Sequence, residues 1–285
     1  MEKSKILQEE IKMYTVAEFN EIGKEMEDLL YLRSAPIAIK VLYDENEVPE
    51  GCYVPSKDRD ERPALCQAFA QVRRNRRSMV MRKEDHWCLW PLISFKLGPV
   101  DEDDIKYVGS GYFIKGREAS EAYWRANFPF IREEKQNVGI AIAPLASCTF
   151  QPDAVMVYCA PDQLRQLLMA VKYSTAKIAG SAMDTVGSCI NALIPVLNGD
   201  QDFCMTIPDP GEYERALAGD NEMIFVFRGD KTDALIEGMR DINNMGFGYK
   251  KLAMDMNIEY PRAEFYNVMF AKWGLKTGEQ WGFDR

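Results

Sequence analysis

Two almost uninterrupted apolar segments constrain the fold of this chain more than any other feature. Residues 138–144 (VGIAIAP) and 154–159 (AVMVYC) have the length of strands, and neither alternates with polar residues. Such segments are typical of strands that are covered on both faces of a sheet. The second segment is followed by Pro161 and by leucines at helical spacing. A strand that leads into a helix in this way indicates an α/β layer.

The remaining patterns agree with that fold class. Thr15 and Glu18 have the spacing of a capping box at the start of a helix. Shorter apolar segments predict further strands, and amphipathic segments predict helices between them. The predicted strands are 36–43, 78–81, 203–207 and 223–227, and further helices begin near residues 63, 117, 161, 189 and 230. We therefore expect an α/β protein, with α+β as the alternative, in which helices pack on a mixed sheet.

The chain has 285 residues and shows neither an internal repeat nor a linker rich in proline, glycine or serine. This length is sufficient for one large domain. We predict a charged lead-in over 1–14, a single compact domain over 15–255, and an aromatic extension over 256–285 that packs on the body.

The composition excludes several classes of partner. The net charge of −9 argues against a dedicated nucleic-acid-binding protein, because phosphate neutralisation requires a basic face. No segment approaches the roughly 20 apolar residues of a membrane helix, and the first residues lack a signal-peptide core. We therefore expect no membrane partner and a cytoplasmic location, where thiols stay reduced. The odd number of seven cysteines also argues against a disulfide framework. The oligomeric state stays open.

His86 is the only histidine. Metal sites that are built on two or more histidines are therefore excluded, and any catalytic scheme with a histidine base must use His86. The chain also lacks the glycine-rich signatures of dinucleotide and P-loop binding. The cysteines consequently become the main candidates for chemistry.

Three of the cysteines lie where helices are predicted to begin: Cys66 after Pro63, Cys88 in a turn after a strand, and Cys189 after Gly187. A helix N-terminus lowers the pKa of a thiol, and thiolates bind metals. However, the spacing of the three cysteines matches no ferredoxin or zinc-ribbon pattern. Spacing alone leaves open that each one is a small buried apolar residue.

The other four cysteines carry weaker signals. Cys148 and Cys204 lie in apolar surroundings, and Cys52 lies in a predicted loop. Cys159 ends a predicted strand, where sites of α/β proteins are often built, but we assign it no role.

Several segments of the sequence, taken together, resemble a known family, the prokaryotic family catalogued as domain of unknown function 169. The resemblance extends from about residue 15 to 255. It rests on Ala35-Pro36-Ile37-Ala38-Ile39-Lys40, Cys66-Gln67, Cys88 before Pro91 and Gly98, Pro152-Asp153-Ala154-Val155-Met156-Val157-Tyr158 before Pro161, and Cys189 before Pro195.

The resemblance implies that Cys66, Cys88 and Cys189 belong to the pattern of the family. The pattern is similar to that of proteins that hold a 4Fe-4S cluster by three thiolates and leave one iron open. On that basis we expect an oxidoreductase or a lyase that acts on a small molecule, with an electron-donor protein as a further partner. Two alternatives stay open, namely a non-catalytic small-molecule binding module and a zinc site in which His86 is a fourth ligand.

Overall fold

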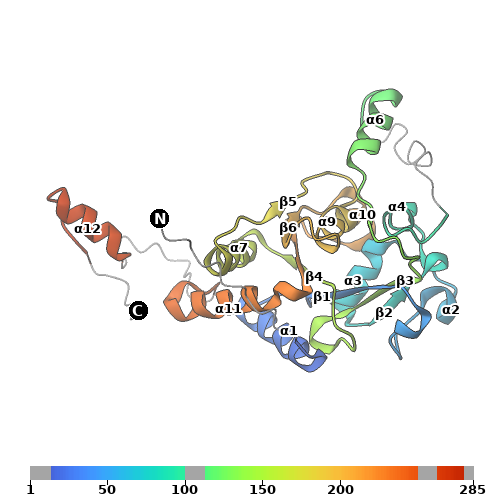
Figure 1. Cartoon of the computed structure of the whole chain (residues 1–285), viewed down its shortest axis with the longest axis horizontal. Coiled ribbons are helices and arrows are strands. Elements are labelled where there is room, and N and C mark those ends of the chain that lie inside the picture. The colour runs from blue at the N-terminus through green and yellow to red at the C-terminus, as the bar shows by residue number, and fades with distance from the viewer. Residues whose placement is uncertain (1–13, 100–112, 250–261, 279–285) are drawn as a thin grey trace, which may run out of the picture.

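In the residues that the structure describes (14–99, 113–249 and 262–278), seven strands form one sheet at the centre of the computed structural model (Figure 1). Their order is β2-β3-β1-β4-β7-β6-β5. Every neighbouring pair is antiparallel except β5 and β6, which are parallel. The strands are β1 Ile37–Leu42, β2 Met79–Met81, β3 Gly139–Pro144, β4 Ala154–Cys159, β5 Gly180–Ser181, β6 Phe203–Thr206 and β7 Met223–Arg228. The mixed sheet that the sequence predicts is confirmed.

Helices cover both faces of this sheet. Those of the described residues are α1 Val16–Leu30, α2 Pro55–Arg59, α3 Leu65–Asn75, α4 Leu89–Ser94, α6 Arg117–Asn127, α7 Pro161–Thr175, α8 Ser188–Asn191, α9 Leu193–Leu197, α10 Pro210–Ala216, α11 Thr232–Ile242 and α12 Glu264–Lys272. The fold is thus an α/β domain, as the sequence predicts. Within the described part of the chain, no helix is long and apolar enough to span a membrane.

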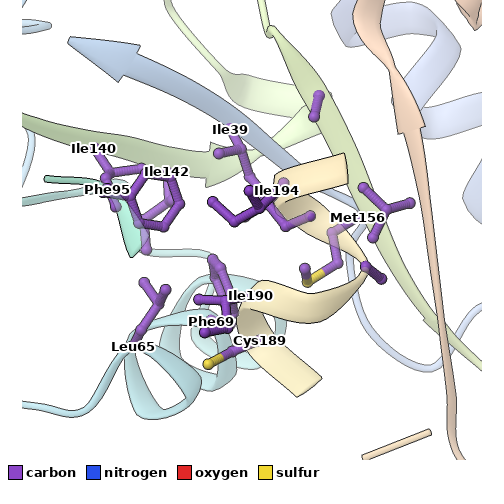
Figure 2. Close-up of a cluster of buried hydrophobic side chains, with 14 of the residues drawn as sticks. Ile39, Leu65, Phe69, Phe95, Ile140, Ile142, Met156, Cys189, Ile190 and Ile194 are labelled. Carbon is purple, nitrogen blue, oxygen red and sulfur yellow. The ribbon is translucent and has the colours of Figure 1, made fainter. Parts of the chain in front are cut away.

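The side chains of the strands alternate between two apolar cores. In β1, Ile37, Ile39 and Val41 belong to a core with α3, α8 and α9, and part of that core is drawn in Figure 2. Ala38 and Leu42 belong to the core on the opposite face, with α1, α7 and α11. Successive residues of a strand point to opposite faces, so a segment that is buried on both faces must be apolar throughout. This explains the uninterrupted apolar segments.

The first helix illustrates how local signals fix an element. The Thr15 hydroxyl accepts a hydrogen bond from the Glu18 backbone N–H (3.3 Å), and the Glu18 carboxylate accepts one from the Thr15 N–H (2.7 Å). The predicted capping box is therefore present. The buried side chains Phe19, Ile22 and Met26 then lie at helical spacing against the sheet.

Some details differ from the sequence-based expectations. The loop predicted around Cys52 is followed directly by the short helix α2, and the two-residue strand β5 was not predicted. The helix predicted to begin near residue 230 begins at Thr232, after a short 3-10 turn over Gly229–Lys231. The predicted lead-in over 1–14 falls outside the described residues, apart from Tyr14.

The C-terminal extension is represented by α12, which Figure 1 shows apart from the sheet and its covering helices. Phe265, Val268 and Trp273 are exposed, by 59% or more of their surface. In the described residues these three side chains are therefore exposed, and the packing of the whole extension 256–285 on the body stays a prediction.

Candidate functional site

Cys66, Cys88 and Cys189 line one pocket of about 400 Å³. The pocket lies where α3, α4, α8 and α10 begin, and these four helices come from distant parts of the sequence. Figure 2 shows Cys189 at the edge of the buried core, with Leu65 and Phe69 of α3 nearby. The three cysteines that sequence patterns selected are thus brought together by the fold.

Each cysteine is held at the start of its helix. Cys66 is the second residue of α3, and its thiol donates a weak hydrogen bond to the carbonyl oxygen of Gly211 (3.9 Å). Cys88 is the N-cap residue of α4. Cys189 is the second residue of α8 and follows Gly187, whose φ of 76° is in the left-handed region that favours glycine. The predicted placement at helix starts is confirmed for all three.

Asp209 joins two of these helix starts. One oxygen of its carboxylate accepts hydrogen bonds from the backbone N–H groups of Gly187 (2.6 Å) and Ser188 (3.1 Å). The other oxygen caps α10 by accepting from the Glu212 N–H (2.9 Å). The sequence analysis did not select Asp209. Its signal was present in the sequence, because Asp-Pro-x-Glu at 209–212 places an N-cap residue before a proline at the first helical position.

Burial, rather than helix position, determines the pKa of the three thiols. Burial raises the pKa of Cys66 to about 12, raises that of Cys88, and raises that of Cys189 well above its usual value. The expectation of lowered pKa values is therefore wrong, because the loss of hydration opposes the thiolate more strongly than the helix starts favour it. Burial therefore favours the neutral thiols, and a bound cation would favour the thiolates because metal binding releases their protons.

Arg215 supplies positive charge at the pocket. Its guanidinium lowers the pKa of both Cys66 and Cys88, although less than burial raises them. The same guanidinium lies over the ring of Trp87, 5.2 Å from the ring centroid. Trp87 is 64% exposed and forms one wall of the pocket, with Trp90 as another. One side of the pocket is therefore aromatic and cationic.

A buried acid lies behind the thiols. Glu212 accepts a hydrogen bond from the Tyr158 hydroxyl on Oε1 (2.8 Å), whereas its Oε2 is buried with no hydrogen-bond partner. Burial raises the pKa of Glu212 to about 7. The charge of Glu212 in turn raises the pKa of both Cys66 and Cys189. Glu212 is thus a group that can hold or release a proton near neutral pH beside two of the thiols.

His86 is not among the residues that line this pocket. Its side chain is buried, neither ring nitrogen has a hydrogen-bond partner, and burial lowers its pKa to about 4. Among the described residues, no group of three or more His, Cys, Asp or Glu side chains is arranged to hold a single metal ion. A 4Fe-4S cluster makes a different geometric demand, since each of its thiolate ligands binds a different iron.

The other four cysteines lie elsewhere, and all seven are free thiols. Cys148 and Cys204 are buried in the apolar cores, and Cys52 is half-buried. Cys159 lines a second pocket, beside Tyr158. The separation of Cys66, Cys88 and Cys189 from the rest therefore agrees with their positions in the fold.

The fold and the pocket define a class of protein: a mixed α/β domain with three cysteines around one cavity. The family model described as DUF169 (Uncharacterised ArCR) matches residues 25–238, so the chain belongs to that family. The resemblance inferred from the sequence is thereby confirmed. No curated protein and no solved structure matches the chain.

Proposed function

We propose that Cys66, Cys88 and Cys189 hold a 4Fe-4S cluster with one iron that has no protein ligand. The protein then acts as an oxidoreductase or a lyase on a small molecule, with an electron-donor protein as a partner for the redox case. The observation that carries this proposal is that three cysteines, far apart in the sequence, line a single pocket.

The residues of the pocket fit such a group. Three sulfur donors match the usual ligands of iron–sulfur clusters, and His86, the only histidine, is not at the pocket. The positive charge of Arg215 beside Cys66 and Cys88 favours thiolates there. The seven free thiols agree with a reducing compartment, and we include a cytoplasmic location in the proposal.

In this proposal the bound cluster and the residues of the chain supply different parts of the chemistry. A cluster with an open iron supplies either a Lewis acid for a substrate oxygen or sulfur, or a site for single-electron transfer. Trp87 and Trp90 line the pocket and offer apolar surface to a substrate. Arg215 attracts an anionic substrate group. Glu212 does not line the pocket, but with a pKa raised to about 7 it is a buried group beside Cys66 and Cys189 that holds or releases a proton near neutral pH.

Serine substitutions test the proposal. Cys66→Ser, Cys88→Ser and Cys189→Ser each remove one sulfur ligand, whereas Cys148→Ser and Cys204→Ser change buried free thiols outside the pocket and serve as controls. After anaerobic reconstitution we expect the first three variants to lose most of the iron and sulfide that the wild-type protein and the controls retain. Equal iron content in all five variants contradicts the proposal.

The alternatives give different results in the same preparation. A Cys3His zinc site predicts bound zinc in place of iron, and its loss in His86→Ala. The cluster proposal predicts that His86→Ala retains its iron, since His86 does not line the pocket. A non-catalytic small-molecule binding module predicts no metal in any variant.

A further inference from the structure

A second pocket, of about 560 Å³, is lined in part by Tyr158, whose hydroxyl donates to Glu212. It begins where β4 ends at Cys159 and α7 starts. The described residues that line it are largely polar, and they include three arginines: Arg33, Arg73 and Arg74. The function proposed above makes no use of this pocket.

Positive charge exceeds negative charge among these residues. The only carboxylate in the described lining is Glu222. It is occupied by the buried Arg73, whose two terminal nitrogens donate to the two Glu222 oxygens (2.7 and 3.0 Å). Arg74 lies farther from Glu222 (4.0 Å) and is anchored through one nitrogen to the Leu217 carbonyl oxygen. The lining therefore carries three guanidinium groups against one carboxylate, which Arg73 and Arg74 share.

The start of a helix also lies at this pocket. Ala160, the N-cap residue of the 15-residue helix α7, lines the pocket. The N-terminus of a helix carries a partial positive charge that stabilises anions. Part of the backbone at the start of α7 is already bonded: the Ala160 N–H donates to Gln163 Oε1 (2.7 Å), and the Gln163 N–H donates to Asp162 Oδ1 (3.0 Å). The Asp162 carboxylate also accepts a hydrogen bond from the Tyr249 hydroxyl (2.9 Å), so it offsets part of the positive charge although it is not among the lining residues.

Two tyrosines stand at the same pocket. The rings of Tyr31 and Tyr249 are 6.3 Å apart at an interplanar angle of 46°. Both residues line the pocket, and Tyr31 is 53% exposed. They offer apolar surface to the part of a ligand that is not charged.

We propose that this pocket binds a small anionic molecule through a carboxylate or a phosphate group, with Arg33 and Arg74 as its charged donors. Arginine presents a planar fork of N–H groups that matches both oxyanions. The Tyr158 ring lines the pocket, and its hydroxyl donates to Glu212 beside the cysteines. This inference does not depend on a metal, so its test uses metal-free protein.

The test measures the shift in melting temperature of metal-free protein on addition of sodium phosphate or of sodium citrate, at constant ionic strength. The two arms distinguish a phosphate ligand from a carboxylate ligand. The double variant Arg33→Gln/Arg74→Gln spares the Arg73–Glu222 pair. Its matched control is Arg59→Gln/Arg62→Gln, which removes the same charge from exposed positions outside the pocket.

We expect at least one of the two salts to raise the melting temperature of the wild-type protein and of the control. In the double variant, binding weakens about tenfold or more for each guanidinium that is lost. Two results overturn the inference: the absence of any shift with either salt, and an equal shift in the double variant and its control. Binding to the metal-free protein, followed by loss in the double variant, supports the inference even where the cysteines hold no iron.

Discussion

Glu212 has an unusual environment for a carboxyl group, and this leads to a quantitative prediction. Its side chain is 1% exposed, and burial raises its pKa from 4.5 to about 7. Between these two pH values the folded protein keeps a proton that the unfolded chain has released. The free energy of unfolding therefore falls as pH rises through this range. The difference corresponds to about 3 kcal/mol of lost stability above pH 7.

Glu212→Gln removes this titration but keeps an oxygen that can accept the hydrogen bond from Tyr158. In metal-free protein, we expect the free energy of unfolding of the variant, relative to wild type, to increase by about 3 kcal/mol between about pH 5 and about pH 8. Urea unfolding at the two pH values measures this change, and any constant cost of the amide cancels in the comparison.

The exposed Glu214, on the same helix, provides the control. We expect Glu214→Gln to follow the pH dependence of the wild-type protein. If the difference between Glu212→Gln and wild type is the same at both pH values, the raised pKa of Glu212 and its buried environment are both refuted.

Three further predictions concern stability in urea. Burial lowers the pKa of His86 to about 4. As pH falls below 6.5, the unfolded chain therefore takes up a proton at this histidine before the folded protein does. We expect wild type to lose about 2 kcal/mol of stability near pH 5, a loss that His86→Gln does not show. An equal loss in both proteins would contradict this. Arg73→Gln leaves Glu222 partly buried without its partner and costs about 3 kcal/mol at neutral pH, and a cost near zero would mean that the pair is not formed. In Gly229→Ala the added carbon would lie 2.0 Å from the Pro152 carbonyl oxygen, so we expect a loss of about 2 kcal/mol; an unchanged melting temperature would rule out this close approach.

The central strands could be predicted because burial on both faces requires an uninterrupted apolar segment, which is visible in the local sequence. Val155 and Val157 pack on one face and Met156 and Tyr158 on the other, so the whole segment is apolar. The strand β5 has no such apolar segment. It has two residues, and it exists because the chain pairs with β6, a long-range contact that composition does not encode.

The candidate site was predictable to a similar extent. Helix starts at Cys66, Cys88 and Cys189 follow from local patterns of proline, glycine and apolar residues. The sequence cannot show how deeply a thiol is buried, and the predicted lowering of the thiol pKa values was wrong for that reason. Asp209 and Glu212 were missed because their importance comes from packing against elements far away in the sequence.

The central claim is that the three pocket cysteines hold a 4Fe-4S cluster. Iron and acid-labile sulfide, measured per chain in wild-type protein that is purified and reconstituted without oxygen, test it most directly. The account predicts about four iron and about four sulfide ions per chain, with the broad visible absorption of such a cluster. A colourless protein that binds neither iron nor sulfide after reconstitution would contradict the account.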